Sequence, residues 1–242
     1  MKLIITAGGT SEPIDNVRKI TNKSSGRLGN IIAQEFAKHL GDDDKIYFVC
    51  PKDVLVITNH FFEVVRVSDV DSVYKALEEL VPKCDAIIHS MAISDYKVDY
   101  VTTSHDIAEC VAKEDAPTIR MCLESGSVYH YQRGEKISSY SDDLMIHLVK
   151  TPKIIEKIKQ WNPAIKLVGF KLLSGVTDDE LLAAAKGQKE KCGCDMVVAN
   201  DIKNISADKH EAIILTDDDI YKVSTKEEIA EFLYTALKDV TA

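Results

Sequence analysis

Short apolar runs alternate along the chain with segments in which apolar residues recur every three or four positions. The runs predict buried strands, and the recurring positions predict amphipathic helices. Predicted strands cover 2–7, 46–49, 54–57, 62–67, 85–89, 165–170, 196–199, 212–215 and 220–223. Because the earlier strands are separated by helices, the pattern favours a mostly parallel α/β sheet with helices on both faces.

Capping residues mark where the predicted helices begin. Serine, threonine and aspartate are favoured just before the first helical residue, and a proline is favoured at that residue. The predicted starts are Ser24 or Ser25, Ser68 or Asp69, Thr151 with Pro152, Thr177 with Glu180, and Ser224 with Glu227.

The least regular stretch runs from Asp95 to Ser141 and carries five tyrosines. Part of it, 118–123, alternates as a strand would, and Gly126 and Gly134 interrupt the rest. We therefore expect one domain over 1–242, with 96–141 as an excursion made of a β-ribbon and a flexible loop. Long excursions in compact domains are often lids or subunit contacts, so this stretch predicts an active-site lid and a homodimer.

Composition narrows the functional classes. The 242 residues include 30 Lys and Arg against 39 Asp and Glu, which gives a net charge of −9. This balance argues against nucleic-acid partners and gives no sign of a membrane partner. The first apolar stretch is too short for a signal peptide, so we expect a cytoplasmic protein. The six cysteines, Cys192 and Cys194 included, are interpreted as small buried apolar residues.

Polar or glycine-rich sequence follows four of the predicted strands, where open α/β sheets bind ligands. These segments are 7–18 with 20–29, then 90–96, 169–171 and 198–201. Ser24-Ser25-Gly26 before a helix offers backbone N–H groups to a phosphate, and Arg18, Lys23 and Arg27 add positive charge. The structural alternative is that Ser25 only caps the helix and that the glycines ease packing.

A Rossmann-like NAD(P)-dependent oxidoreductase is the obvious competitor. Pro13 and the long loop 12–23 lie where that class begins its first helix. Cys50-Pro51 ends the second clear strand, where an acidic residue should bind the ribose. Walker, His-Glu-x-x-His and Gly-x-Ser-x-Gly motifs are absent from the sequence.

A series of motifs in order along the chain resembles the phosphopantothenate–cysteine ligases of coenzyme A synthesis, in a stand-alone bacterial form. The most specific motif is Gly8-Gly9-Thr-x-Glu-x-Ile-Asp15-x-Val-Arg18. The others are Ile20-Thr-Asn22-x-Ser-Ser-Gly26-x-x-Gly29, Ala92-Ile-Ser-Asp95-Tyr, Lys136-Ile-Ser-Ser, Thr151-Pro-Lys-Ile154, Gly169-Phe170 and Val198-Ala-Asn200.

The resemblance implies a Rossmann-like fold and a two-step ligation. The carboxylate of 4′-phosphopantothenate attacks the α-phosphate of a nucleoside triphosphate, usually CTP, and releases pyrophosphate. The amine of L-cysteine then displaces the nucleoside monophosphate. Mg²⁺ is the implied cofactor, and a flavin-dependent decarboxylase is the implied functional partner.

The family motifs also imply residue roles. Asn22 and Arg18 would serve the attack by cysteine, and Lys136 would contact the nucleotide from a flexible segment. Asp95 would bind Mg²⁺ or polar groups of the nucleotide. The remaining nucleotide- or substrate-binding candidates are Gly8, Gly9, Thr10, Ser24, Ser25, Gly26, Met91, Ala92, Pro152, Ile154, Phe170, Lys189 and Asn200.

Several points stay open. Two family lysines are replaced by Gln188 and Cys192, with Lys189 and Lys191 as neighbours, so the choice between CTP and ATP is undecided. Arg18 could instead form a surface ion pair with Glu12 or Asp15. The oxidoreductase and a non-catalytic nucleotide-binding relative remain as alternative classes.

Overall fold

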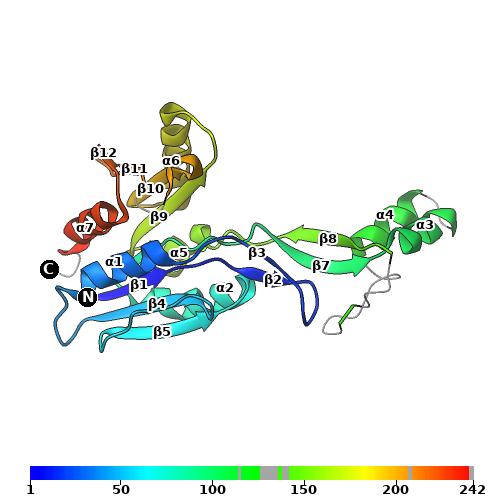
Figure 1. Cartoon of the computed structure of the whole chain (residues 1–242), viewed down its shortest axis with the longest axis horizontal. Helices are drawn as coiled ribbons and strands as arrows, with labels where there is room; N and C mark the ends of the chain where they lie inside the picture. Colours follow the sequence, from blue (N-terminus) through cyan, green and yellow to red (C-terminus); the bar gives the residue numbers. More distant parts are fainter. Residues whose placement is uncertain (114–115, 126–135, 138–141, 207–208, 240–242) are drawn as a thin grey trace. The chain divides into compact units, whose positions relative to one another are not determined.

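The computed structural model describes residues 1–113, 116–125, 136–137, 142–206 and 209–239. The chain divides into two compact units, each of which is discontinuous in sequence. Figure 1 shows their secondary structure along the chain. Unit 1 comprises Met1–Thr10, Lys23–Ala92 and Lys153–Ala242, and unit 2 comprises Ser11–Asn22 and Ile93–Pro152. The sequence predicts a single excursion at 96–141, whereas unit 2 extends beyond that stretch and also includes residues 11–22.

Unit 1 is built on an eight-stranded sheet with the order β12-β11-β10-β9-β6-β1-β4-β5. The strands are β1 (Lys2–Thr6), β4 (Lys45–Pro51), β5 (Phe62–Val67), β6 (Ala86–His89), β9 (Lys166–Leu173), β10 (Met196–Asp201), β11 (Ala212–Leu215) and β12 (Ile220–Val223). The strands from β5 to β10 are parallel, and the β11–β12 hairpin closes one edge in antiparallel fashion. This order confirms the predicted Rossmann-like, mostly parallel α/β fold.

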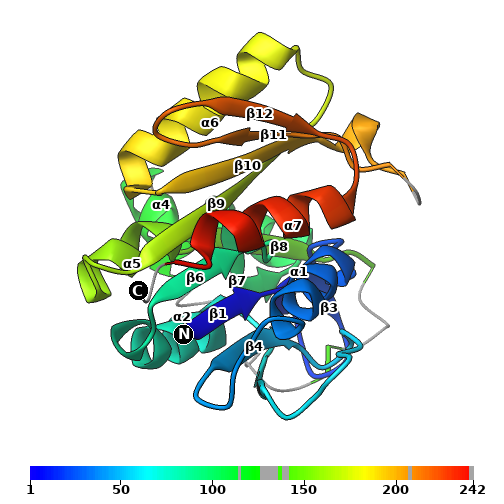
Figure 2. The ribbon, with the colours of Figure 1, turned by 90° about the vertical axis from the view of Figure 1, so that its left-hand side faces the viewer.

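Helices cover both faces of this sheet. Figure 2 shows α1 and α7 together on one face, where their apolar side chains pack against Leu3, Ile5 and Ala7 of the first strand and its end. Helices α2, α5 and α6 follow one another over the other face. The helices are α1 (Arg27–Ala37), α2 (Val70–Leu80), α5 (Ile155–Trp161), α6 (Asp178–Cys192) and α7 (Lys226–Leu237), with 3-10 turns η1 (Val81–Lys83) and η2 (Ile202–Asn204).

Two helix starts agree with the sequence prediction. Asp69 caps α2 by accepting a hydrogen bond from the N–H of Ser72. Thr177 and Glu180 form the predicted capping box of α6, and Gly193 ends that helix in the left-handed conformation. These local signals fix the helix ends independently of the rest of the fold.

Unit 2 contains two antiparallel strand pairs and a pair of helices. Strands β2 (Ser11–Pro13) and β3 (Lys19–Thr21) form the shorter pair. Strands β7 (Tyr96–Thr102) and β8 (Met145–Lys150) form a ribbon, and α3 (Ser104–Lys113) and α4 (Ala116–Ser125) follow β7. A hydrogen bond from the Tyr100 hydroxyl to the Leu123 carbonyl, 2.6 Å, links the ribbon to α4.

Two predicted strands are wrong. Residues 54–57 form a loop, because the buried side chain of Val54 packs against the backbone turn at Gly8 and Gly26 instead of joining the sheet. Residues 118–123, whose apolar and polar residues alternate as in a strand, lie inside α4. They are therefore helical and do not belong to the β-ribbon. The ribbon is instead formed by β7 and β8.

Three predicted helix starts are also displaced. Helix α1 has Gly26 at its N-cap, one residue after Ser25, whose hydroxyl accepts a hydrogen bond from the Arg27 N–H at 3.4 Å. Thr151 donates its hydroxyl to the Ser94 carbonyl, and α5 begins only at Ile155. Helix α7 is capped by Thr225, one residue after the predicted Ser224.

The cysteines that the structure resolves in full, Cys50, Cys84, Cys110, Cys192 and Cys194, are free and buried, as the sequence predicts. Burial raises the pKa of Cys84 to about 11, which keeps that thiol protonated at neutral pH. None of the described helices is long and apolar enough to cross a bilayer.

Candidate functional site

The loops after β1 and β6 meet at the point where the strand order of the sheet reverses. Successive strands run from β1 through β4 to β5 on one side, and from β6 through β9 to β10 on the other. The N–H of Ala92 donates to the Gly8 carbonyl at 2.9 Å, and the N–H of Thr10 donates to the Ala92 carbonyl at 3.1 Å. The predicted residues Gly8, Gly9, Thr10, Met91 and Ala92 therefore lie together at the switch point, where open α/β sheets bind ligands.

Three glycines lie where β1 ends and where α1 begins. Gly8 and Gly26 have φ values of +87° and +72°, which side chains rarely tolerate. A Cβ on Gly26 would lie 3.3 Å from the Gly8 nitrogen, so the two turns are neighbours. A Cβ on Gly29 would lie 2.5 Å from the Cβ of Ala7, so this glycine lets α1 approach β1 closely.

The N-terminus of α1 offers hydrogen-bond donors beside these turns. Its cap residue, Gly26, provides no side-chain acceptor. Ser24 and Ser25 are exposed immediately before it, and the Ser25 hydroxyl lies 3.4 Å from the Arg27 nitrogen. The first N–H groups of a helix have no partner within the helix, and its dipole favours negative charge there. The arrangement is chemically suited to a phosphate group.

A buried polar network supports the switch point. The Thr6 hydroxyl accepts a hydrogen bond from the Met91 N–H at 3.2 Å and lies 3.0 Å from Nδ1 of His89. Ser90 donates its hydroxyl to the Thr6 carbonyl at 2.6 Å. Burial lowers the pKa of His89 to about 4, so its imidazole is neutral at physiological pH. Sequence analysis missed Thr6 and His89, whose only signal is a polar residue at the end of an apolar strand.

Phe170 lies at the same edge of the sheet. Strand register aligns Thr6 with His89 and His89 with Gly169, the residue before Phe170. The Phe170 carbonyl accepts a hydrogen bond from Nε2 of Gln188 at 3.3 Å. Gln188 thus contacts the backbone of a predicted nucleotide- or substrate-binding residue.

The other unit 1 candidates have different surroundings. Lys189 forms an ion pair with Asp217, in the turn between the edge strands β11 and β12 and not beside β1 and β6. Asn200 is buried at the end of β10, with Nδ2 3.4 Å from Nε2 of His210. Ile154 is buried and immediately precedes α5.

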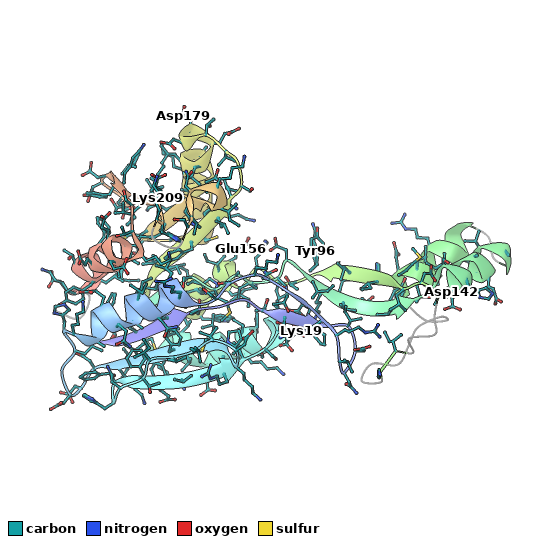
Figure 3. All side chains as sticks on the ribbon, in the orientation of Figure 1. Lys19, Tyr96, Asp142, Glu156, Asp179 and Lys209 are labelled. Atoms are coloured by element: carbon teal, nitrogen blue, oxygen red, sulfur yellow. The ribbon has the colours of Figure 1, made fainter. Side chains whose placement is uncertain are left out.

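The remaining candidates belong to unit 2. Arg18 forms an ion pair with Asp15, which is the alternative that the sequence leaves open for it. Asn22 is half-buried after β3, Lys136 is exposed, and Pro152 is exposed after β8. Asp95 is exposed, and its carbonyl accepts a hydrogen bond from the Thr151 N–H at 3.0 Å. Figure 3 shows the side chains of this unit around the labelled residues Lys19 and Tyr96.

The predicted lid is only partly visible. Lys136 and Ile137 are described, whereas Gly134, Ser138 and Ser139 of the same segment lie outside the described residues. In the described part of the chain, no three His, Cys, Asp or Glu side chains are arranged to hold a metal ion.

Comparison with known proteins gives a family match over nearly the whole chain. The family model of the DNA/pantothenate metabolism flavoprotein C-terminal domain matches residues 1–108 and 100–240. The coenzyme A biosynthesis bifunctional protein CoaBC of Thermococcus kodakarensis is 30% identical over 241 residues, covering 98% of this chain and 51% of that protein. The chain thus spans about half the length of this relative.

Solved structures have the same fold. The DNA/pantothenate metabolism flavoprotein from Streptococcus pneumoniae is 36% identical, with a TM-score of 0.84 and 99% of each chain covered. A mutant of Cab2 in complex with phosphopantothenate-cysteine has a TM-score of 0.69 at 15% identity, covering 99% of this chain and 87% of that one. At that identity the second likeness concerns the fold alone.

Proposed function

Because this chain belongs to the family of the DNA/pantothenate metabolism flavoprotein C-terminal domain, we propose that it joins 4′-phosphopantothenate to L-cysteine in coenzyme A biosynthesis. The observation that carries the proposal is that the turn at Gly8, after β1, lies beside Gly26, the N-cap of α1, which offers no side-chain acceptor to the first N–H groups of that helix. This geometry suits a phosphorylated ligand. The name of the CoaBC relative supplies the pathway, and the sequence motifs that resemble phosphopantothenate–cysteine ligases supply the substrate class.

In the first half-reaction, a carboxylate oxygen of phosphopantothenate attacks the α-phosphorus of the nucleotide, which we propose to be CTP. A new O–P bond forms, the bond to the β-phosphate breaks, and pyrophosphate leaves. The N–H groups at the start of α1 would bind phosphate oxygens without reorganising during the reaction. The Ser24 and Ser25 hydroxyls stand at the same helix end, and Lys136 would contribute a positive charge.

In the second half-reaction, the amine of cysteine attacks the acyl carbon of the mixed anhydride. A C–N bond forms, the acyl C–O bond breaks, and the nucleoside monophosphate leaves while the amine loses a proton to solvent. The amide of Asn22 would hold the acyl group, and Arg18 would stabilise the departing phosphate. Such a reaction needs alignment and charge stabilisation more than a protein nucleophile.

Magnesium fits this chemistry as a substrate-bound ion. Mg²⁺ is usually held by one or two carboxylates together with phosphate oxygens and water, and when bound it neutralises phosphate charge. Asp95 is an exposed carboxylate that could supply such a ligand. We predict that excess chelator abolishes pyrophosphate release and that added Mg²⁺ restores it. Undiminished turnover in chelator would remove the ion from the proposal.

The direct test is a pyrophosphate-release assay with phosphopantothenate, run separately with CTP and ATP and with and without cysteine. The proposal expects release without cysteine in a single turnover, and amide formation only when cysteine is added. Nucleotide binding without pyrophosphate release would instead indicate a non-catalytic relative. A nicotinamide or flavin absorbance in the purified protein would favour an oxidoreductase.

We also propose a homodimer. The ribbon strand β8 exposes Met145, Ile146 and Leu148, with 45%, 36% and 40% of their surfaces accessible. Equilibrium sedimentation at several protein concentrations measures the molecular mass directly. A monomer at all concentrations would refute this part of the proposal. Functional pairing with a flavin-dependent decarboxylase stays a prediction.

A further inference from the structure

The carboxylate of Asp15 is the centre of a buried hydrogen-bond cluster in unit 2. Only 1% of its side chain is accessible. Its Oδ1 accepts from the N–H groups of Val17 and Arg18, at 2.8 and 2.7 Å. Its Oδ2 accepts from Nε and Nη2 of the Arg18 guanidinium, at 3.0 and 2.5 Å. One oxygen thus holds the local turn, and the other holds the arginine side chain.

The same oxygen reaches a distant part of the chain. Oδ2 also accepts from the N–H of Ile137 at 3.2 Å, across 122 positions of sequence. Nη2 of Arg18 in turn donates to the Ile137 carbonyl at 3.1 Å. Both backbone groups of Ile137 are therefore held by the Asp15–Arg18 pair, and only 3% of this residue is accessible.

Ile137 directly follows Lys136, whose side chain is exposed. Consecutive Cα atoms are about 3.8 Å apart, so fixing Ile137 restricts where the Lys136 ammonium can reach. The Arg18 guanidinium holds the pKa of Asp15 well below its usual range, so the carboxylate stays charged at all working pH values.

We propose that Asp15 is a positioning residue that fixes Arg18 and the backbone beside Lys136 relative to each other. The inference rests on the proposed function, because Lys136 and Arg18 are its candidate residues for nucleotide transfer and for amide formation. One carboxylate would then align the side chains that serve the two half-reactions. Pre-aligned charges stabilise a transition state more effectively than charges that must first be ordered.

The substitution Asp15→Asn separates the two functions of the carboxylate. The amide keeps one oxygen for the turn at Val17 and Arg18. Its NH₂ group replaces the second oxygen and faces the donors of Arg18 and Ile137, which it cannot accept. A matched control is Asp143→Asn, since the Asp143 carboxylate in the same unit accepts only from the exposed N–H of Ser104 among the contacts that the structure gives it.

Hydrogen exchange tests the cluster without any substrate. We expect the Ile137 amide to exchange at least roughly tenfold faster in Asp15→Asn, because its acceptor is lost. The control should leave that rate unchanged. An unaltered Ile137 rate in Asp15→Asn would overturn the inference, whether or not the enzyme turns over phosphopantothenate.

A double-mutant cycle with Lys136→Gln tests the positioning role. We expect Asp15→Asn alone to slow single-turnover pyrophosphate release by roughly ten- to a hundredfold, as misplaced groups do. When Lys136→Gln is already present, adding Asp15→Asn should slow pyrophosphate release little further, because the ammonium that Asp15 positions has already been removed. Fully additive losses would show that Asp15 has only a structural role.

The two proposals fail separately. If the wild-type protein releases no pyrophosphate with CTP or ATP, the proposed function is wrong. Accelerated exchange at Ile137 in Asp15→Asn would still establish the cluster in that case. If the wild-type protein is active but the variant is as active as the Asp143→Asn control, the positioning role is wrong and the proposed function stands.

Discussion

The side chain of Asn22 is half-buried in the loop that follows β3. Replacing it by aspartate keeps its size but substitutes a negative charge for an amide donor, beside what we propose to be an anionic intermediate. We expect Asn22→Asp to slow amide formation by on the order of a hundredfold, while single-turnover pyrophosphate release continues. Quenched-flow detection of both products measures the two steps.

Asn59→Asp is the control for added charge. Its side-chain oxygen accepts from the Phe61 N–H at 3.0 Å, and aspartate retains that acceptor. The control should form amide at the wild-type rate. Amide formation at that rate by Asn22→Asp would mean that Asn22 only shapes its loop.

Lys136 is exposed, so its side chain contributes little to folding. Its proposed contribution is one positive charge directed at phosphate oxygens. We expect Lys136→Gln to slow pyrophosphate release by on the order of a hundredfold and to leave the melting temperature unchanged. Lys19→Gln, which removes an exposed lysine of β3, should affect neither. Normal turnover by Lys136→Gln would exclude the lysine from nucleotide transfer.

Sequence reasoning identified candidate residues but not their mutual contacts. Gly8 and Ala92 follow two predicted strands, and the ends of neighbouring parallel strands meet at one sheet edge, so their proximity is predictable from the sequence. The contact between Asp15 and Ile137 spans 122 positions and depends on how a loop folds, so the spacing of apolar residues in the sequence does not predict it. The roles of the candidates stay predictions.

At the scale of elements, the pattern of apolar residues predicts a strand correctly where the strand joins the sheet. Strands β1 and β6 agree with the prediction to within a few residues, since a strand buried on both faces is continuously apolar. The edge strand β5 also agrees, although most of its residues are only half-buried or exposed. The pattern failed at 54–57, where Val54 is buried by packing on glycine turns and not by sheet pairing. It failed again at 118–123, where a short helix with a weakly segregated face resembles an alternating strand.

The contact between α1 and β1 depends on the absence of a side chain at Gly29. Alanine favours helix by about 1 kcal/mol over glycine, but here its Cβ would lie 2.5 Å from the Cβ of Ala7. We expect Gly29→Ala to lower the free energy of unfolding by about 1–3 kcal/mol, the usual cost of overpacking. Urea denaturation followed by circular dichroism measures the change.

Gly187 provides the matched comparison within α6. A Cβ there would meet nothing within 4 Å. Gly187→Ala should therefore raise the free energy of unfolding by about 0.5–1 kcal/mol. If Gly29→Ala were equally stabilising, the close approach of α1 to β1 would not be the reason for that glycine.

At the scale of the whole molecule, buried His89 makes folding pH-dependent. Its pKa is about 4 in the folded protein and 6.5 in an unfolded chain. Between these two pH values the unfolded state binds more protons than the folded state. The contribution of neutral His89 to the free energy of unfolding is therefore fully present above pH 6.5 and is lost as the pH falls towards 4. The contribution of His89 that is lost amounts to about 3 kcal/mol of the free energy of unfolding, at 1.36 kcal/mol per pKa unit.

The measurement is the free energy of unfolding at closely spaced pH values from 4 to 7.5. His89→Asn removes one titrating group and should make this slope shallower, whatever its effect on stability at pH 7.5. The remaining slope includes His210, whose pKa burial also lowers to about 4. His105→Asn is the control, because 77% of the His105 side chain is accessible. An unchanged slope in His89→Asn would assign the pH dependence to other groups.

The pairing of α1 with α7 has a consequence for the order of synthesis. Ile32, Ala33 and Phe36 of α1 share one apolar core with Ile229, Leu233 and Leu237 of α7. A ribosome makes the first set before every other described helix and the second set after them. The apolar face of α1 therefore stays uncovered while all the elements between α1 and α7 are synthesised, and during that time chaperones or other chains can bind it.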